Sequence, residues 1–146
     1  MKMLEESEEL KEDKMTYLSY PEAVLIHILL MRLSREGLYG VFDRALVESA
    51  LTRPKQARAY EDADLVRQAA TLCYGLIKNH PWVAGNKRTA TALTNEFLKR
   101  NGKIIETPIR EVIELVLAVE ADMRQVDEIE VWLRPRVVDV PDRGTV

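Results

Sequence analysis

Residues 80–88 read His-Pro-Trp-Val-Ala-Gly-Asn-Lys-Arg and separate two segments whose apolar residues recur at helical spacing. Because the residue before a proline avoids helical geometry, Pro81 predicts that the first of these helices ends by His80. Gly85 permits a positive φ, which suits a tight turn, and the next helix is predicted to begin at about Asn86. The stretch therefore predicts a short turn that leads directly into a helix N-terminus.

The first turn of this second helix carries two cations, Lys87 and Arg88. A helix start exposes unpaired N–H groups and the positive end of the helix dipole, so cations there oppose the dipole. A bound anion compensates for that conflict, and phosphate is the natural candidate. His80, at the mouth of the same turn, is suited to proton transfer near neutral pH. The residues alone leave two interpretations open: a site for phosphoryl chemistry, or a helical corner with solvated cations.

The rest of the chain is helical in its periodicity almost throughout, without internal repeats or alternating strand blocks. Ser19 and Glu22 form a capping-box pattern for the first helix. Arg53 to Asp62 is polar and lacks the periodicity, so we predict an exposed loop or hairpin there, with Pro54 closing the helix before it. Helices are predicted over residues 19–37, 43–54, 64–78, 86–100, 107–119 and 127–133, with a short extended piece at 103–106. These patterns predict an all-α domain with at most a small β hairpin.

Size, charge and cysteine content narrow the class of protein. The chain has 146 residues and a net charge of −3, which predicts one domain without general affinity for nucleic acid. Its single cysteine, Cys73, cannot form an internal disulfide and indicates a reducing compartment. The sequence lacks an apolar run of about 18 residues and a secretory signal, so we expect a cytoplasmic protein with no membrane partner.

Composition also suggests where the folded domain lies. Residues 1–16 are acidic and polar and predict a solvated N-terminal extension. Residues 17–134 carry the helical pattern and form the expected domain. Residues 135–146 contain two prolines and a glycine with little apolar periodicity, which predicts a flexible tail.

The turn and its surroundings resemble the Fic/Doc family. In that family His-Pro-Phe is followed by two variable or acidic positions and then Gly-Asn, and the Doc (death-on-curing) branch continues with Lys-Arg-Thr-Ala, as residues 87–90 do here. His27, residues 46–51 and residues 97–102 are also similar to Doc-type sequences. The resemblance covers roughly residues 17–124. It implies the Fic fold, a helical bundle, and a toxin of a toxin–antitoxin pair.

The resemblance also implies roles for individual residues. His80 corresponds to the catalytic base that takes a proton from a target hydroxyl, and Gly85 and Asn86 shape the phosphate-binding loop. Lys87 and Arg88 correspond to cations that neutralise nucleotide phosphates. In the Doc branch the lysine is associated with transfer of the γ-phosphate, whereas the AMP-transferring branch usually has glycine there. The implied activity is kinase-type transfer from ATP or another nucleoside triphosphate to a hydroxyl of a cytoplasmic protein, with a translation factor as a candidate.

Two partners are implied by the same likeness. Residues 53–62 lie where the family has a flap that docks the target by strand pairing, which makes Arg53, Lys55, Gln56 and Tyr60 candidate docking residues. Self-silencing Fic proteins carry Ser or Thr four residues before a Glu-Gly or Glu-Asn pair. The only such pair here, at Glu36, is preceded by an arginine at that spacing. We therefore expect control by a separate small antitoxin protein that covers the cleft.

The sequence departs from the family pattern at two positions. Trp82 replaces phenylalanine, for which we expect repacking. Ala84 stands where the family has the acidic residue that holds Mg²⁺, and alanine has no ligand atom, so we predict no protein metal ligand there. A substitute from Glu61, Asp62 or Asp64 is one alternative.

Several interpretations therefore stay open. Ala84 supports a catalytically impaired module that binds nucleotide or antitoxin. AMP transfer to protein is a further alternative, which Lys87 disfavours. His27 is either a structural histidine or an indirect partner of the active site.

Overall fold

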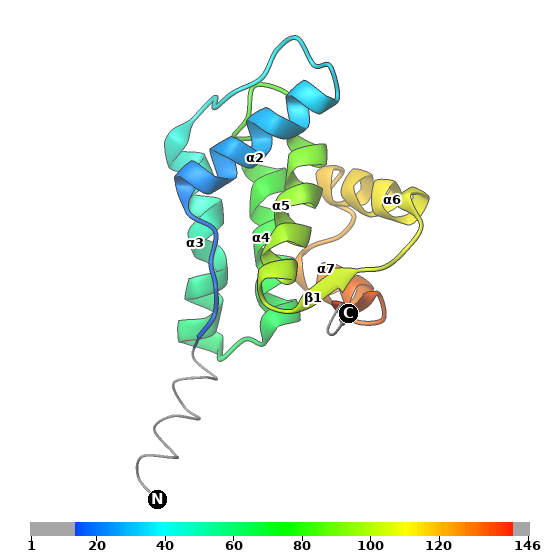
Figure 1. Ribbon diagram of the computed structural model, residues 1–146. Coiled ribbons are helices and arrows are strands. Elements are labelled where there is room, and N and C mark those ends of the chain that lie inside the picture. Colours follow the sequence, from blue (N-terminus) through cyan, green and yellow to red (C-terminus); the bar gives the residue numbers. More distant parts are fainter. Residues whose placement is uncertain (1–13, 142–146) are drawn as a thin grey trace, which may run out of the picture.

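The computed structural model describes residues 14–141, and these form a bundle of helices with one small sheet (Figure 1). In chain order the elements are α2 (Tyr20–Leu33), α3 (Arg44–Glu61), α4 (Leu65–Asn79), α5 (Asn86–Arg100), β1 (Lys103–Ile105), α6 (Ile109–Glu120), α7 (Val126–Leu133) and β2 (Val137–Asp139). α4 contacts α3, α5, α6 and α7, while α2 crosses α5 on the outside. The expected all-α class with a small β element is confirmed.

α4 lies at the centre of the bundle because its side chains are small or apolar on nearly every face. Leu72 and Leu76 are fully buried, and Gln68 is buried with its amide bonded to the Ala63 carbonyl at 3.0 Å. A Cβ on Gly75 would lie 2.6 Å from the Arg53 side chain and 3.4 Å from the α3 backbone. The glycine therefore leaves room for the Arg53 side chain to lie against α4.

Three helices begin with side-chain caps that the sequence signals. Ser19 and Glu22 form the expected capping box of α2. Asp43 accepts a hydrogen bond from the Leu46 N–H at the start of α3, and Asp64 accepts one from Arg67 at the start of α4. These caps satisfy N–H groups at the starts of α2, α3 and α4.

The prediction of a loop or hairpin at residues 53–62 is wrong. α3 continues through Pro54 to Glu61 and ends at Asp62, which has a φ of 52°. A proline inside a helix costs about 3 kcal/mol, but Pro54 belongs to a buried stripe that packs toward α4. Within residues 53–62 the stripe consists only of Pro54 and Ala57, so this part of the helix shows little apolar periodicity in the sequence.

The candidate docking residues of this segment, Arg53, Lys55, Gln56 and Tyr60, consequently lie on a helix. Helical N–H and C=O groups bond within the helix, so this segment has no free strand edge for a target peptide. Arg53 lies over the ring of Tyr74, at 5.6 Å from its centroid. A docking role through strand pairing therefore needs another segment.

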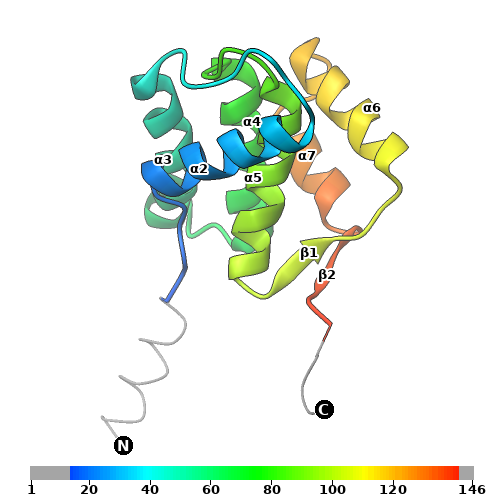
Figure 2. The same ribbon diagram turned by 45° about the horizontal axis from the view of Figure 1, so that its top comes forward.

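The two strands come from distant parts of the chain rather than from a hairpin (Figure 2). They are antiparallel, with Ile104 opposite Val138. The expected flexible tail is therefore wrong for residues 137–139, which are strand β2. Residues 142–146 of that tail, and residues 1–13 of the expected N-terminal extension, lie outside the described residues.

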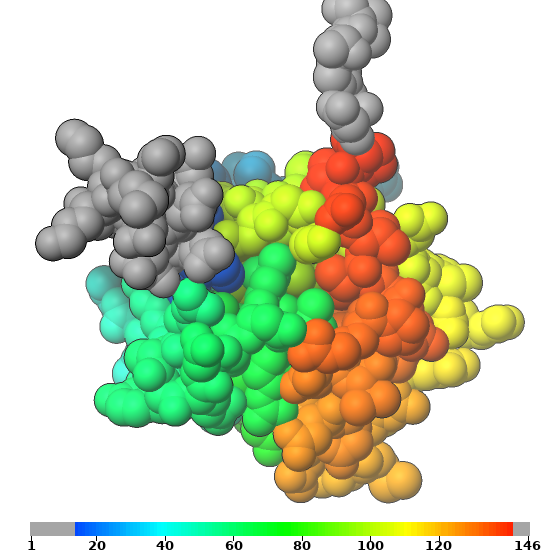
Figure 3. Space-filling model, turned by 90° about the horizontal axis from the view of Figure 1, so that it is seen from below, coloured from blue at the N-terminus to red at the C-terminus, as the bar shows by residue number. Residues whose placement is uncertain are grey.

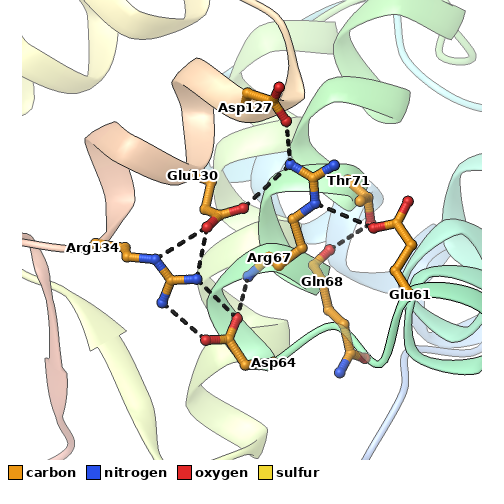
Figure 4. Close-up of polar contacts among 8 residues, drawn as sticks. All are labelled: Glu61, Asp64, Arg67, Gln68, Thr71, Asp127, Glu130 and Arg134. Atoms are coloured by element: carbon orange, nitrogen blue, oxygen red, sulfur yellow. Dashed lines mark hydrogen bonds and ion pairs between the residues drawn. The ribbon is translucent and has the colours of Figure 1, made fainter.

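α7 is held against the start of α4 by apolar packing and by ion pairs. Viewed from below, α7 (orange) lies beside the first turns of α4 (Figure 3). Arg67 pairs with Asp127 and Glu130, and Arg134 pairs with Asp64 at 2.9 Å and with Glu130 at 2.7 Å (Figure 4). Among the helices described, none is long and apolar enough to cross a membrane.

Candidate active site

The turn between α4 and α5 is bounded by two residues with left-handed backbone geometry. His80 follows α4 with φ 50° and ψ 52°, and Gly85 precedes α5 with φ 70° and ψ 29°. A Cβ on Gly85 would lie 2.5 Å from Cε of Met31, which is fully buried in α2. The positive φ and the contact with Met31 therefore both favour glycine at position 85.

Asn86 closes the turn with a reciprocal pair of hydrogen bonds. Its Oδ1 accepts from the Trp82 N–H, and its Nδ2 donates to the Trp82 carbonyl, each at 2.9 Å. Asn86 is itself buried, so its role is to shape the turn from behind. Because Gly85 supplies no capping side chain, the N–H groups at the start of α5 have no side-chain cap.

A cavity of about 820 Å³ opens above this helix start. One side carries the charged and titratable groups and consists of His80, the turn residues 82–86, Lys87 and Arg88. The opposite side is apolar and consists of one face of α6, from Ile109 to Leu117. The structure thus brings together His80, Gly85, Asn86, Lys87 and Arg88, the five residues that the sequence proposed for one site.

His80 is oriented by the end of its own helix. Its Nδ1 lies 3.2 Å from the Ile77 carbonyl oxygen, one of the last-turn carbonyls that a helix leaves without an internal partner. A carbonyl oxygen only accepts, so in this contact Nδ1 carries the proton. In the neutral ring the lone pair then lies on Nε2, which is the form that a general base requires.

His27 supports the turn from the core side. Its ring stacks on Trp82 with centroids 4.2 Å apart, and its Nε2 accepts from the Gly40 N–H at 3.0 Å. Nδ1 then donates to Thr89 Oγ1, 2.9 Å away. Burial lowers the pKa of His27 to about 4, so the ring is neutral at pH 7. His27 does not line the cavity itself, but it contacts Trp82, which does.

The segment after α2 pairs with the turn as a short extended piece. Val41 and Trp82 form an antiparallel bridge, and the Val83 N–H donates to the Gly40 carbonyl at 2.9 Å. The Phe42 N–H donates to the Pro81 carbonyl, also at 2.9 Å. Extended backbone beside the site is thus found at residues 40–42, and not at residues 53–62. The two glycines at 37 and 40 are the signal for a non-helical segment here.

Each cation of the site has a carboxylate neighbour that the sequence analysis missed. Lys87 Nζ lies 2.9 Å from Glu120 Oε2, and Arg88 Nη1 lies 3.8 Å from Glu36 Oε2. The hydrogen bond from Lys87 lowers the pKa of the Glu120 carboxyl. Both contacts join residues that are far apart in the chain, so no local sequence pattern predicts them.

The residues at the site do not fit a protein-bound Mg²⁺. Ala84 offers no ligand atom, and the described residues that line the cavity include no carboxylate. The substitutes considered from the sequence are misplaced: Asp64 caps the far end of α4, about 24 Å from His80 by helix rise. Glu61 pairs with Arg67 in the same remote cluster, and Asp62 pairs with Arg58. Residues 14–141 contain no group of three His, Cys, Asp or Glu side chains suited to a metal.

Of the comparisons with known proteins, the family model supports the site described above. A search among curated proteins found no match. The model of the Fic/DOC family matches residues 17–98, which is more than half of the chain and includes α2 to α4, the turn at residues 80–88 and most of α5. The chain belongs to the Fic/DOC family.

Proposed function

We propose that this protein transfers the γ-phosphate of a nucleoside triphosphate, with ATP as the first candidate, to a hydroxyl group of a cytoplasmic protein. Membership of the Fic/DOC family supports transfer from a nucleotide to a protein in general. The observation that carries the finer proposal is the position of His80 beside the uncapped, doubly cationic start of α5.

The chemistry follows from these side chains. Nε2 of His80 accepts the proton of the target hydroxyl as its oxygen forms a bond to the γ-phosphorus. The bond between that phosphorus and the bridging oxygen breaks, and its electron pair leaves with the nucleoside diphosphate. Lys87, Arg88 and the free N–H groups of α5 neutralise charge on the phosphates.

The form of the cavity also suits a nucleotide. A nucleotide has a highly charged end and a flat, largely apolar base, and the cavity has cations on one side and the α6 wall on the other. Lys87, where the AMP-transferring branch usually has glycine, favours the γ-phosphate over AMP as the transferred group.

Ala84 favours a second candidate, a catalytically impaired module that binds nucleotide or an antitoxin. This candidate predicts nucleotide binding without turnover. An Ala84→Asp variant should gain metal-dependent transfer if the missing acid is the only defect, whereas unchanged activity would count against this reading.

We further propose that a small antitoxin protein controls the site. Ile109, Ile113 and Leu117 line the cavity yet are 71%, 50% and 50% exposed, which suits coverage by an apolar segment of a partner. Growth of bacteria that express the protein alone tests the toxin role. Arrest that disappears with His80→Ala would support it, and equal growth of both strains would oppose it.

Radiolabelled ATP distinguishes the transferred groups. The purified chain is incubated with a bacterial lysate and ATP labelled at either the γ- or the α-position. Protein labelled only from the γ-position supports phosphate transfer, and a translation factor is the first band to identify. Label from the α-position would show AMP transfer instead, and label from neither, across several metals and nucleotides, would contradict both.

A further inference from the structure

Lys87, which lines the cavity, forms an ion pair with Glu120, and this pair joins the first turn of α5 to the last residue of α6. Nζ and Oε2 are 2.9 Å apart, and the two side chains are 39% and 37% exposed. Solvent and ions therefore reach the pair, and a dissolved anion can exchange with the carboxylate.

Both charges lie at helix ends whose dipoles oppose them. Lys87 occupies the positive end of α5, and Glu120 occupies the negative end of α6, which has no basic residue in its last turn. Each charge would destabilise its own helix if it stood alone. Because the two meet, each offsets the unfavourable field that the other experiences.

The end of α6 that carries Glu120 is tied to the last turn of α4. Lys78, in the last turn of α4, donates to the Glu120 backbone carbonyl at 3.4 Å and also pairs with Asp122. The hydrogen bond from Lys87 lowers the pKa of Glu120, so the carboxyl is ionised at neutral pH. A negative oxygen is thus held on Lys87 before any ligand arrives.

We propose that Glu120 occupies the place of a phosphate oxygen on Lys87 and so determines how tightly, and for which phosphates, the site binds. The inference rests on the proposed function, since it takes phosphate to be the ligand of the α5 start. A triphosphate reaches Lys87, Arg88 and the free N–H groups together and displaces the carboxylate. Inorganic monophosphate reaches fewer donors and competes poorly. Glu120 thus acts through Lys87 and determines which phosphates the site prefers.

Calorimetric titration of the full chain with inorganic triphosphate tests the proposal. Glu120→Gln removes the competing charge while keeping the side-chain shape, and we expect it to bind roughly tenfold more tightly than wild type. Glu114→Gln is the matched control, because Glu114 is an exposed residue on the same helix that does not line the cavity. Its affinity should equal that of wild type, and unfolding curves confirm that each variant is folded.

The Lys87→Met change distinguishes competition from general repulsion. If the Glu120 carboxylate competes with triphosphate for Lys87, the Lys87→Met change weakens triphosphate binding more in the Glu120→Gln background than in wild type. Equal losses of affinity in the two backgrounds would contradict competition between Glu120 and triphosphate for Lys87. Equal triphosphate affinity of wild type and Glu120→Gln, with both binding, would overturn the role of Glu120 and leave the phosphate site standing. No triphosphate binding by any variant would overturn this inference and the proposed function together.

Discussion

The starts of α4 and α5 are built in opposite ways, although the two helices have equal length and pack side by side. α4 begins with an acidic cap, Asp64, whose carboxylate accepts from Arg67 and Arg134. α5 begins with Gly85, no side-chain cap and two cations, Lys87 and Arg88. The first arrangement satisfies its own N–H groups and dipole, whereas the second leaves both available to a ligand. The contrast supports the proposal that the start of α5 binds a ligand, whereas the start of α4 stabilises the fold.

The largest stability effect is expected at Gly85. Gly85→Ala places a Cβ 2.5 Å from Met31 at a positive φ, so we expect a loss of about 2–4 kcal/mol in unfolding free energy. Gly102→Ala is the control, since Gly102 also has a positive φ but no atom within 4 Å of the added Cβ. Urea denaturation measures both. Equal losses would show that contact with Met31 is unimportant.

His27 should make stability depend on pH. Its pKa is lowered to about 4 by burial, while the unfolded side chain has a pKa of about 6.5. The unfolded chain therefore gains a proton first as the pH falls, and this contribution to stability, complete above about pH 6.5, declines toward pH 4. Between pH 7.5 and pH 5 the free energy of unfolding should decrease more for wild type than for His27→Gln. Parallel profiles would contradict the neutral, buried role of His27.

At the start of α4, loss of the cap should affect stability alone. Asp64→Ala is expected to cost about 1 kcal/mol and to leave triphosphate affinity unchanged. Hydrogen bonds from Arg134 lower the pKa of Asp64, so the difference from wild type should be complete above about pH 4 and shrink on acidification through the lower, folded-state value. Asp43→Ala, at the start of α3, provides a comparison. A change in triphosphate affinity with Asp64→Ala would contradict the claim that the start of α4 affects stability alone.

The smallest effect is expected at Arg88, where stability and binding should move in opposite directions. Arg88→Gln removes a cation that opposes the α5 dipole, and its pair with Glu36 is long and half-exposed. We therefore expect a gain of about 0.3–1 kcal/mol in unfolding free energy, together with weaker triphosphate binding. Thermal unfolding and calorimetry test the two directions. A loss of stability would indicate that the contact with Glu36 matters more than the dipole.

The parts of the fold that the sequence predicted are those with local causes. Pro81 and Gly85 bound the turn, and α5 covers the predicted residues because both of its ends have local signals. Ser19 and Asp43 cap helices for the same reason. The residues proposed for the site are neighbours in the chain, so the turn alone brings them together at the cavity.

The parts that the sequence did not predict depend on distant contacts. Pro54 was expected to end a helix, but packing of its stripe against α4 outweighs the local preference. Residues 137–139 have no sequence signal for a strand, and they form one because they pair with β1. Glu120 contacts Lys87 only because α6 folds back across α5. A single sequence contains no local signal for such pairings.

The most direct test of the central claim is the rate of γ-phosphate transfer to lysate protein by wild type and by His80→Ala. General-base catalysis contributes about 10²–10⁴-fold, so we predict a loss of this size for His80→Ala, with triphosphate affinity and thermal unfolding close to wild type. Transfer by His80→Ala at the wild-type rate would contradict the assignment of His80 as the base beside the cationic start of α5.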